Sequence, residues 1–136
     1  MPQYVVSRTM LALNEQGKSV KGSRILLLGL AYKSDVDDMR ESPTFELMDR
    51  FQELGAEVAY HDPYIPVIGP TREHAAWKGH RSVPWDRATI ASFDAVVIAT
   101  NHKAFNLVEL RQWADLTIDC RDAMRNVPGA GRVVRA

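Results

Sequence analysis

Short apolar runs alternate with amphipathic stretches along this chain. Residues 24–29 (RILLLG) and 95–100 (AVVIAT) are continuous apolar runs, as is typical of strands buried on both faces. Residues 57–61, 116–120 and 132–135 predict three further strands, the last of them at a sheet edge. Strands that alternate with helices pair in parallel through right-handed crossovers. The pattern therefore predicts an α/β fold: an open, doubly wound, mostly parallel sheet with helices on both faces.

Helical periodicity fills the stretch before the first strand. Val6, Met10 and Leu13 lie at positions i, i+4 and i+7, which predicts a helix over residues 2–16 with these three side chains on its buried face. Gly17 is the expected stop, because glycine readily adopts the left-handed conformation that ends helices.

A second helix is expected to begin with Ser42 as N-cap and Pro43 in its first turn, and to end at Gly55. Two shorter helices are expected over residues 88–92 and 107–113. The apolar stripe of the second helix comprises Leu47, Phe51 and Leu54.

Residues 65–85 contain three prolines and two glycines, which predicts an irregular excursion with a short strand near residues 82–83. The three tryptophans are expected to pack beneath this excursion; they are Trp77, Trp85 and Trp113.

The chain is long enough for one domain and an additional helix. The polar residues 18–23 resemble a linker, so we expect residues 1–20 to be the end of a neighbouring domain's helix with its linker. Residues 21–136 would then form the domain itself. A first helix that packs on its own sheet is an equally good interpretation.

Composition narrows the class of protein. Apolar residues make up 46% and charged residues 25%, as in ordinary globular domains. A formal net charge of zero argues against nucleic acid or an acidic membrane as partner. The single cysteine excludes an internal disulfide, and the chain has neither a signal-peptide pattern nor a membrane-length apolar run. We expect a soluble, cytoplasmic protein.

Ligands of open α/β sheets bind beyond the carboxyl ends of the strands. That rule selects residues 31–40, 100–105 and 119–121, each of which carries polar or basic side chains. A glycine-rich dinucleotide-binding turn is missing from the first segment, which has only Gly29 before it. Side chains rather than backbone would therefore have to bind a ligand there.

Three side chains of the first segment suit a nucleotide: the aromatic ring of Tyr32, the ammonium of Lys33 and the guanidinium of Arg40. An equally weighted alternative is a solvated loop whose charges cap the following helix. The acidic residues of this segment do not fit a calcium loop, because Arg40 stands where glycine is required. We expect them to pair with the basic residues.

The remaining candidates are less specific. The four histidines show no metal-ligand spacing, and no catalytic triad pattern is found, so we expect neither a metal nor a catalytic residue. His102 lies at a strand end, where it could contact a ligand, but we expect a surface imidazole; Cys120 is expected to be a buried, inert thiol. Arg121, oriented by Asp119, suits an anion or sugar hydroxyls; the alternative is an Asp–Arg pair that joins two loops.

The segment GLAYKSDVDDMRESP (residues 29–43) resembles the UDP-glucose/GDP-mannose dehydrogenase family, specifically its carboxy-terminal UDP-binding domain. The MPQYVV opening and ALNEQGKSVKGSRILLLGLAYK are similar to the junction with that family's central domain. Later landmarks are GAEVAYHDPYIP, FDAVVIATNHKAF and TIDCRDAM. Within the family, VDDMRESP, DPYIP and REH are most similar to UDP-N-acetylhexosamine 6-dehydrogenases. The resemblance implies a Rossmann-like fold.

It also implies a three-part enzyme: an upstream Rossmann domain that holds NAD, a helical central domain that supports a homodimer, and this UDP-binding domain. Such enzymes oxidise the C6 alcohol of a UDP-sugar to a carboxylate in two hydride transfers, through a cysteine. That cysteine lies in upstream motifs outside this chain, so the isolated chain should be inactive. Cys120 stands where the family commonly has threonine and is not the nucleophile.

Matched position by position, Tyr32 corresponds to the family's aromatic residue beside the uracil and ribose. Lys33 corresponds to its lysine at the sugar-nucleotide site, and Arg121 to its arginine near the sugar and diphosphate. Arg40 corresponds to the arginine that reaches NAD in the opposite domain. Ser34 departs from a frequent second lysine. The alternatives are a stand-alone nucleotide- or anion-binding regulatory module and a structural domain for oligomerisation.

Overall fold

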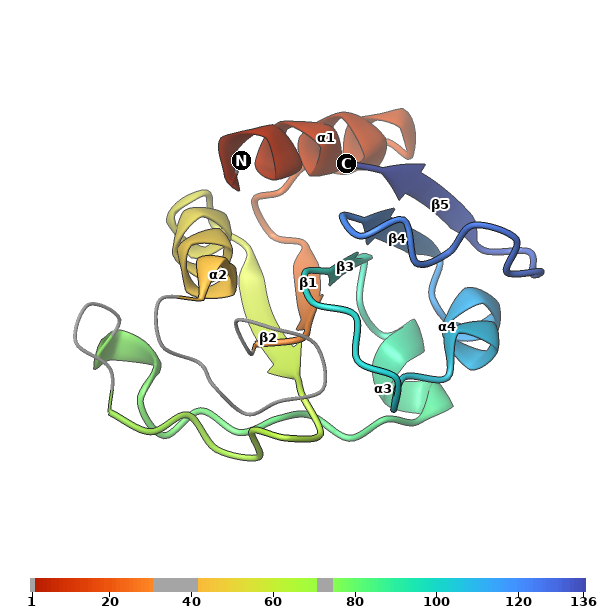
Figure 1. Ribbon diagram of the computed structural model, residues 1–136. Helices are drawn as coiled ribbons and strands as arrows, with labels where there is room; N and C mark the ends of the chain where they lie inside the picture. The colour runs from red at the N-terminus through yellow and green to blue at the C-terminus, as the bar shows by residue number, and fades with distance from the viewer. Residues whose placement is uncertain (1, 31–41, 71–74) are drawn as a thin grey trace.

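A computed structural model describes residues 2–30, 42–70 and 75–136 (Figure 1). Within these ranges the strands form one sheet in the order β2-β1-β3-β4-β5, and every neighbouring pair is parallel. The strands are β1 (Arg24–Leu28), β2 (Glu57–His61), β3 (Ala95–Ile98), β4 (Leu116–Asp119) and β5 (Arg132–Arg135). The helices are α1 (Pro2–Glu15), α2 (Pro43–Glu53), the 3-10 turn η1 (Ala75–Trp77), α3 (Arg87–Ala91) and α4 (Leu107–Trp113). The predicted doubly wound sheet is confirmed.

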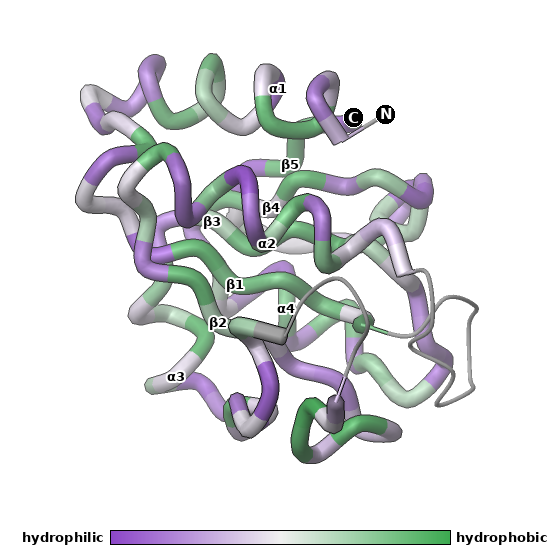
Figure 2. Tube along the Cα trace, turned by 90° about the vertical axis from the view of Figure 1, so that its left-hand side faces the viewer, coloured by the Kyte–Doolittle hydropathy of each residue, from purple (hydrophilic) through white to green (hydrophobic). Residues whose placement is uncertain are grey.

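The sheet lies between two helix layers, with α1 and α2 on one face and α3 and α4 on the other (Figure 1). Strand β1 explains why the central runs are continuously apolar. Ile25 and Leu27 pack in the cluster under α1 and α2, whereas Leu26 and Leu28 pack in the cluster under α3 and α4. All four side chains are fully buried, and the apolar strands run between the layers (Figure 2).

Helix α1 packs on the same core as the sheet. Its buried face consists of Val5, Val6, Thr9, Ala12 and Leu13. The prediction that Met10 belongs to the buried face is therefore wrong, since this side chain is 45% exposed. The reason is that a different face of α1 packs against α2 and β4. Arg8 Nε donates to the Arg135 carbonyl at 3.1 Å, which ties α1 to the last strand. That this helix ends a neighbouring domain stays a prediction.

The start of α2 is confirmed as predicted. Ser42 is the N-cap, its hydroxyl accepts from Thr44 N at 3.3 Å, and Pro43 occupies the first turn. Phe51 is buried as expected, but Leu54 is 41% exposed, because the helix ends at Glu53 and Leu54 is its C-cap residue.

The excursion after β2 is irregular, as predicted. The prediction of a short strand near residues 82–83 is wrong, because the structure has only an isolated antiparallel β-bridge between Val67 and Arg81 in this excursion, as far as its residues are described. Trp77 is buried beneath this excursion, and its indole N–H donates to Asp49 at 2.6 Å. Trp85 and Trp113 pack instead in the cluster under α3 and α4, because their segments lie on that side of the sheet.

Candidate functional site

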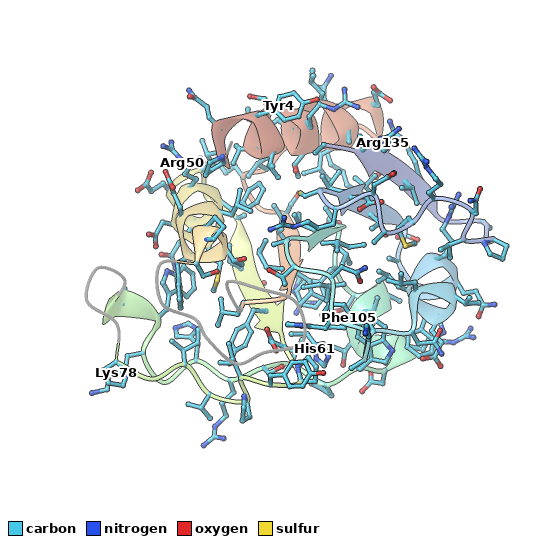
Figure 3. All side chains as sticks on the ribbon, in the orientation of Figure 1. Tyr4, Arg50, His61, Lys78, Phe105 and Arg135 are labelled. Carbon is cyan, nitrogen blue, oxygen red and sulfur yellow. The ribbon has the colours of Figure 1, made fainter. Side chains whose placement is uncertain are left out.

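The strand order creates a switch point next to β1. The chain passes from β1 to β2 on one side and then crosses to β3 on the other, so the loops after β1 and β3 leave the sheet in different directions. The carboxyl ends of β1 to β4 lie at one edge of the sheet because the strands are parallel. His61 and Phe105 lie beside each other there, with ring centroids 5.9 Å apart (Figure 3).

Gly29 and Thr100 pack tightly at this switch point. Gly29 has a φ of +88°, and a Cβ at this position would lie 2.6 Å from Thr100 Cβ. The Thr44 hydroxyl donates to the Gly29 carbonyl at 2.9 Å. The position therefore requires glycine, both for its backbone conformation and for the close approach. Thr100 therefore leaves no room for a side chain at position 29.

Asp62 is fully buried at the end of β2 and links three neighbouring strand ends. Its carboxylate accepts from Leu30 N at 2.7 Å, just after β1, and from Tyr64 N at 2.8 Å in its own loop. His102 Nε2 lies 2.9 Å from the same carboxylate and brings in the loop after β3. Both side chains of the Asp62–His102 pair are inaccessible to solvent.

The prediction that His102 is a surface imidazole is wrong. Its ring is buried between Tyr64 and Phe105, with ring centroids at 4.8 and 5.3 Å, both edge-on. The physical reason is that the loop after β3 folds back over the sheet edge, so that the imidazole reaches the Asp62 carboxylate. The sequence signal was limited to position: Asp62 directly follows β2, and His102 lies in the loop after β3.

Arg121 follows β4 and lies at the same edge. Its Nε donates to the Ala99 carbonyl at the end of β3, at 2.7 Å. The expectation that Asp119 orients the guanidinium is wrong, because the Asp119 carboxylate instead accepts from the backbone N–H groups of Arg121, Ala123 and Met124, at 2.8–3.1 Å. Asp119 therefore shapes the turn, and the Ala99 carbonyl anchors the guanidinium.

The other predicted binding residues lie outside the described part of the chain. Tyr32, Lys33 and Arg40 belong to residues 31–41, and their roles stay predictions. The described residues on either side of this segment are both anchored. Leu30 is buried with its N–H on Asp62, and Ser42 is buried as the cap of α2.

Cys120 is partly buried, so the sequence prediction of a buried thiol is met only in part. Burial and the nearby Asp119 carboxylate raise the pKa of this thiol to about 11, although Arg121 opposes the shift. A thiol with this pKa is almost entirely protonated at neutral pH, so Cys120 is a poor nucleophile.

The described residues contain neither a metal-binding cluster nor a membrane-spanning helix. Across residues 2–30, 42–70 and 75–136, no three His, Cys, Asp or Glu side chains are grouped so that they could hold a metal ion. None of the helices in these ranges is long and apolar enough to cross a bilayer.

Known proteins that resemble this chain are nucleotide-sugar dehydrogenases. It is 46% identical over 108 residues to a UDP-glucose 6-dehydrogenase of Bacillus subtilis strain 168. This alignment covers 77% of this chain and 23% of that protein. It is 24% identical over 105 residues to the UDP-N-acetyl-D-glucosamine 6-dehydrogenase of Salmonella typhi, again 77% of this chain and 23% of that protein. The chain thus spans about a quarter of the length of these relatives.

A solved structure shares the fold. The UDP-D-ManNAc dehydrogenase from Pyrococcus horikoshii superposes with a TM-score of 0.75 at 24% identity, over 98% of this chain and 30% of that one. The sequence itself matches the UDP binding domain of a known family over residues 26–126, a range that includes the switch point and all residues of the candidate site. The chain therefore belongs to the UDP-glucose/GDP-mannose dehydrogenase family, as its UDP binding domain.

Proposed function

We propose that this chain binds the UDP part of the substrate in an NAD-dependent UDP-sugar 6-dehydrogenase. Such an enzyme oxidises the C6 alcohol of the sugar to a carboxylate in two hydride transfers. The observation that carries the proposal is the match to the family's UDP binding domain over residues 26–126. The anchored, exposed Arg121 at the carboxyl edge of the sheet supports it.

Three side chains would hold the nucleotide. The ring of Tyr32 offers a stacking face for uracil, and the Lys33 ammonium offers a compact charge for phosphate. Arg121 is held at Nε by the Ala99 carbonyl, and no other hydrogen bond of its guanidinium is found among the described residues. Its two terminal amino groups would thus be oriented in advance for an anion or sugar hydroxyls.

The contribution of this chain to catalysis would be positioning. Binding energy from the diphosphate, remote from the reacting carbon, can orient C6 towards groups on other domains. The hydride acceptor NAD would be bound mainly by an upstream domain, because the sequence after β1 lacks the glycine-rich turn that binds a dinucleotide and has only Gly29 before it. Arg40 is the residue proposed to reach that NAD.

Two sugars are candidates for the substrate. The similarity of VDDMRESP and DPYIP to UDP-N-acetylhexosamine 6-dehydrogenases favours an N-acetylhexosamine. The second candidate is UDP-glucose, favoured by identities of 46% and 43% to UDP-glucose 6-dehydrogenases of Bacillus subtilis and Rhizobium meliloti. We further propose that the full-length enzyme is a homodimer that is assembled through its central domain.

The proposal is tested with the full-length protein that carries this chain. We expect calorimetry to detect UDP binding, and NADH formation to require a UDP-sugar from a panel that includes UDP-glucose and the UDP-N-acetylhexosamines. The isolated 136-residue chain should form no NADH with any of them. A full-length protein that neither binds UDP nor reduces NAD with any UDP-sugar would overturn the proposal.

A further inference from the structure

The Asp62 carboxylate is a buried junction between three strand ends. Its oxygen Oδ2 is shared by Leu30 N at 2.7 Å and His102 Nε2 at 2.9 Å, and its oxygen Oδ1 accepts from Tyr64 N at 2.8 Å. The backbone N–H of Asp62 in turn donates to the Ser82 hydroxyl at 2.9 Å. An ionised carboxylate only accepts hydrogen bonds, so the imidazole donates from Nε2.

These bonds set the spacing of the loops at the switch point. Leu30 follows β1, Asp62 follows β2 and His102 follows β3, and these three strands are neighbours in the sheet. On the far side of β3, Arg121 bonds to the Ala99 carbonyl at 2.7 Å. These hydrogen bonds thus involve the carboxyl ends of β1, β2, β3 and β4, where the proposed UDP site lies.

A buried pair of this kind is costly to break. The Asp62 and His102 side chains are both inaccessible to solvent, so the loss of either side chain removes a hydrogen bond from the interior of the protein. The imidazole is also held from the side by the edge-on rings of Tyr64 and Phe105. The hydrogen bond and the two ring contacts together fix the orientation of the imidazole.

We infer that Asp62 and His102 are positioning residues of the UDP site. Asp62 fixes the backbone N–H of Leu30, and the chain enters the segment that carries Tyr32 and Lys33 directly after this residue. His102 holds the Asp62 carboxylate in the orientation that reaches Leu30. In this inference both side chains act through the backbone at Leu30. This inference rests on the proposed function of the chain.

The test compares two substitutions of His102 in the full-length protein. His102→Leu removes the donor to Asp62, whereas His102→Gln places an amide N–H close to the position of Nε2. We expect His102→Leu to raise the Kd for UDP and the KM for the UDP-sugar about tenfold, because a binding segment that is less well positioned has to be ordered when the ligand binds. The KM for NAD should stay within about twofold, and His102→Gln should recover most of the UDP affinity.

Tyr60→Phe is the matched control for a purely structural effect. Tyr60 lies on β2, is buried, and donates its hydroxyl to the Ile65 carbonyl at 2.9 Å, in the loop after β2 and not at Leu30. We expect Tyr60→Phe to lower the Tm but to leave the Kd for UDP unchanged. If His102→Leu does not fold, Asp62→Asn is measured in its place, because it keeps the size of the side chain and loses one acceptor oxygen.

Three results separate the inference from its alternatives. A folded His102→Leu protein with unchanged UDP affinity would overturn the inference and leave the proposed function intact. A Tyr60→Phe protein that loses as much UDP affinity for the same loss of Tm would overturn it as well, because the effect would then follow stability alone. An unmodified protein that does not bind UDP would overturn the proposed function, and the inference with it.

Discussion

The Arg121 guanidinium is tied to the neighbouring strand through Ala99, whose carbonyl accepts from Nε at 2.7 Å. This bond joins the loop after β4 to the end of β3 and leaves the terminal amino groups of the arginine at the exposed edge of the sheet. An arginine anchored at Nε loses less conformational freedom on binding an anion than a free one does. The bond therefore makes Arg121 the described residue best prepared for a ligand.

Arg121→Ala in the full-length protein should weaken binding of the UDP-sugar by about 1–3 kcal/mol, the range for a lost hydrogen bond to a charged group. Arg121→Lys should recover only part of this, since lysine cannot bond to Ala99 and present a planar fork at the same time. Arg50→Ala is the control, because Arg50 forms a surface pair with Glu46 on α2. The measurement is UDP calorimetry; equal affinities for Arg121→Ala and Arg50→Ala would contradict the assignment.

Lys33 and Arg40 should affect different substrates. We expect Lys33→Ala to weaken use of the UDP-sugar by about 1–3 kcal/mol and Arg40→Ala to act on NAD instead. Steady-state kinetics with each substrate varied in turn separates the two effects. Should Arg40→Ala change only the KM for the UDP-sugar, its proposed contact with NAD would be wrong.

Gly29→Ala should destabilise the fold severely. Gly29 and Gly79 have almost the same φ, +88° and +87°, but a Cβ on Gly29 would collide with Thr100, whereas a Cβ on Gly79 would meet no atom within 4 Å. Left-handed backbone strain alone costs about 1–2 kcal/mol, and the collision adds roughly 1–3 kcal/mol. Urea unfolding of both variants measures the difference, and equal losses would show that Thr100 moves aside freely.

Cys120 should react slowly with alkylating reagents. Burial and Asp119 raise the pKa of this thiol to about 11, so the thiolate fraction at pH 8 is on the order of one in a thousand. We expect iodoacetamide labelling to be slow in the native protein and fast in urea, as followed by mass spectrometry. Cys120→Thr should keep full dehydrogenase activity, and a large loss would show that this thiol takes part in the reaction.

Alkaline pH should destabilise the fold through Tyr60. Burial, and then the nearby Asp62 carboxylate, raise the pKa of this phenol to about 12 from its ordinary value of 10.0. Above pH 10 the unfolded chain releases the phenol proton more readily than the folded chain, so this stabilisation is lost as pH rises towards 12. The decrease in unfolding free energy between pH 9 and 12 should be smaller for Tyr60→Phe than for the unmodified protein.

Local patterns in the chain were sufficient for most of the fold. The continuous apolar runs at β1 and β3 predicted buried parallel strands, because a strand covered on both faces needs no polar alternation. Ser42 and Pro43 predicted the start of α2, because capping depends on neighbouring residues only. The position of Arg121 after β4 likewise placed it at the carboxyl edge of the sheet, because the carboxyl ends of parallel strands lie at the same edge.

The partners of individual side chains depended on tertiary structure. His102 is buried only because Asp62, 40 positions away, comes to the neighbouring strand end, and Arg121 bonds to Ala99, 22 positions away, rather than to adjacent Asp119. Met10 is exposed because the direction in which α1 packs is set by α2 and β4, and periodicity does not encode that direction. Periodicity and capping are local properties, whereas a hydrogen bond between loops depends on how the strands are ordered in the sheet.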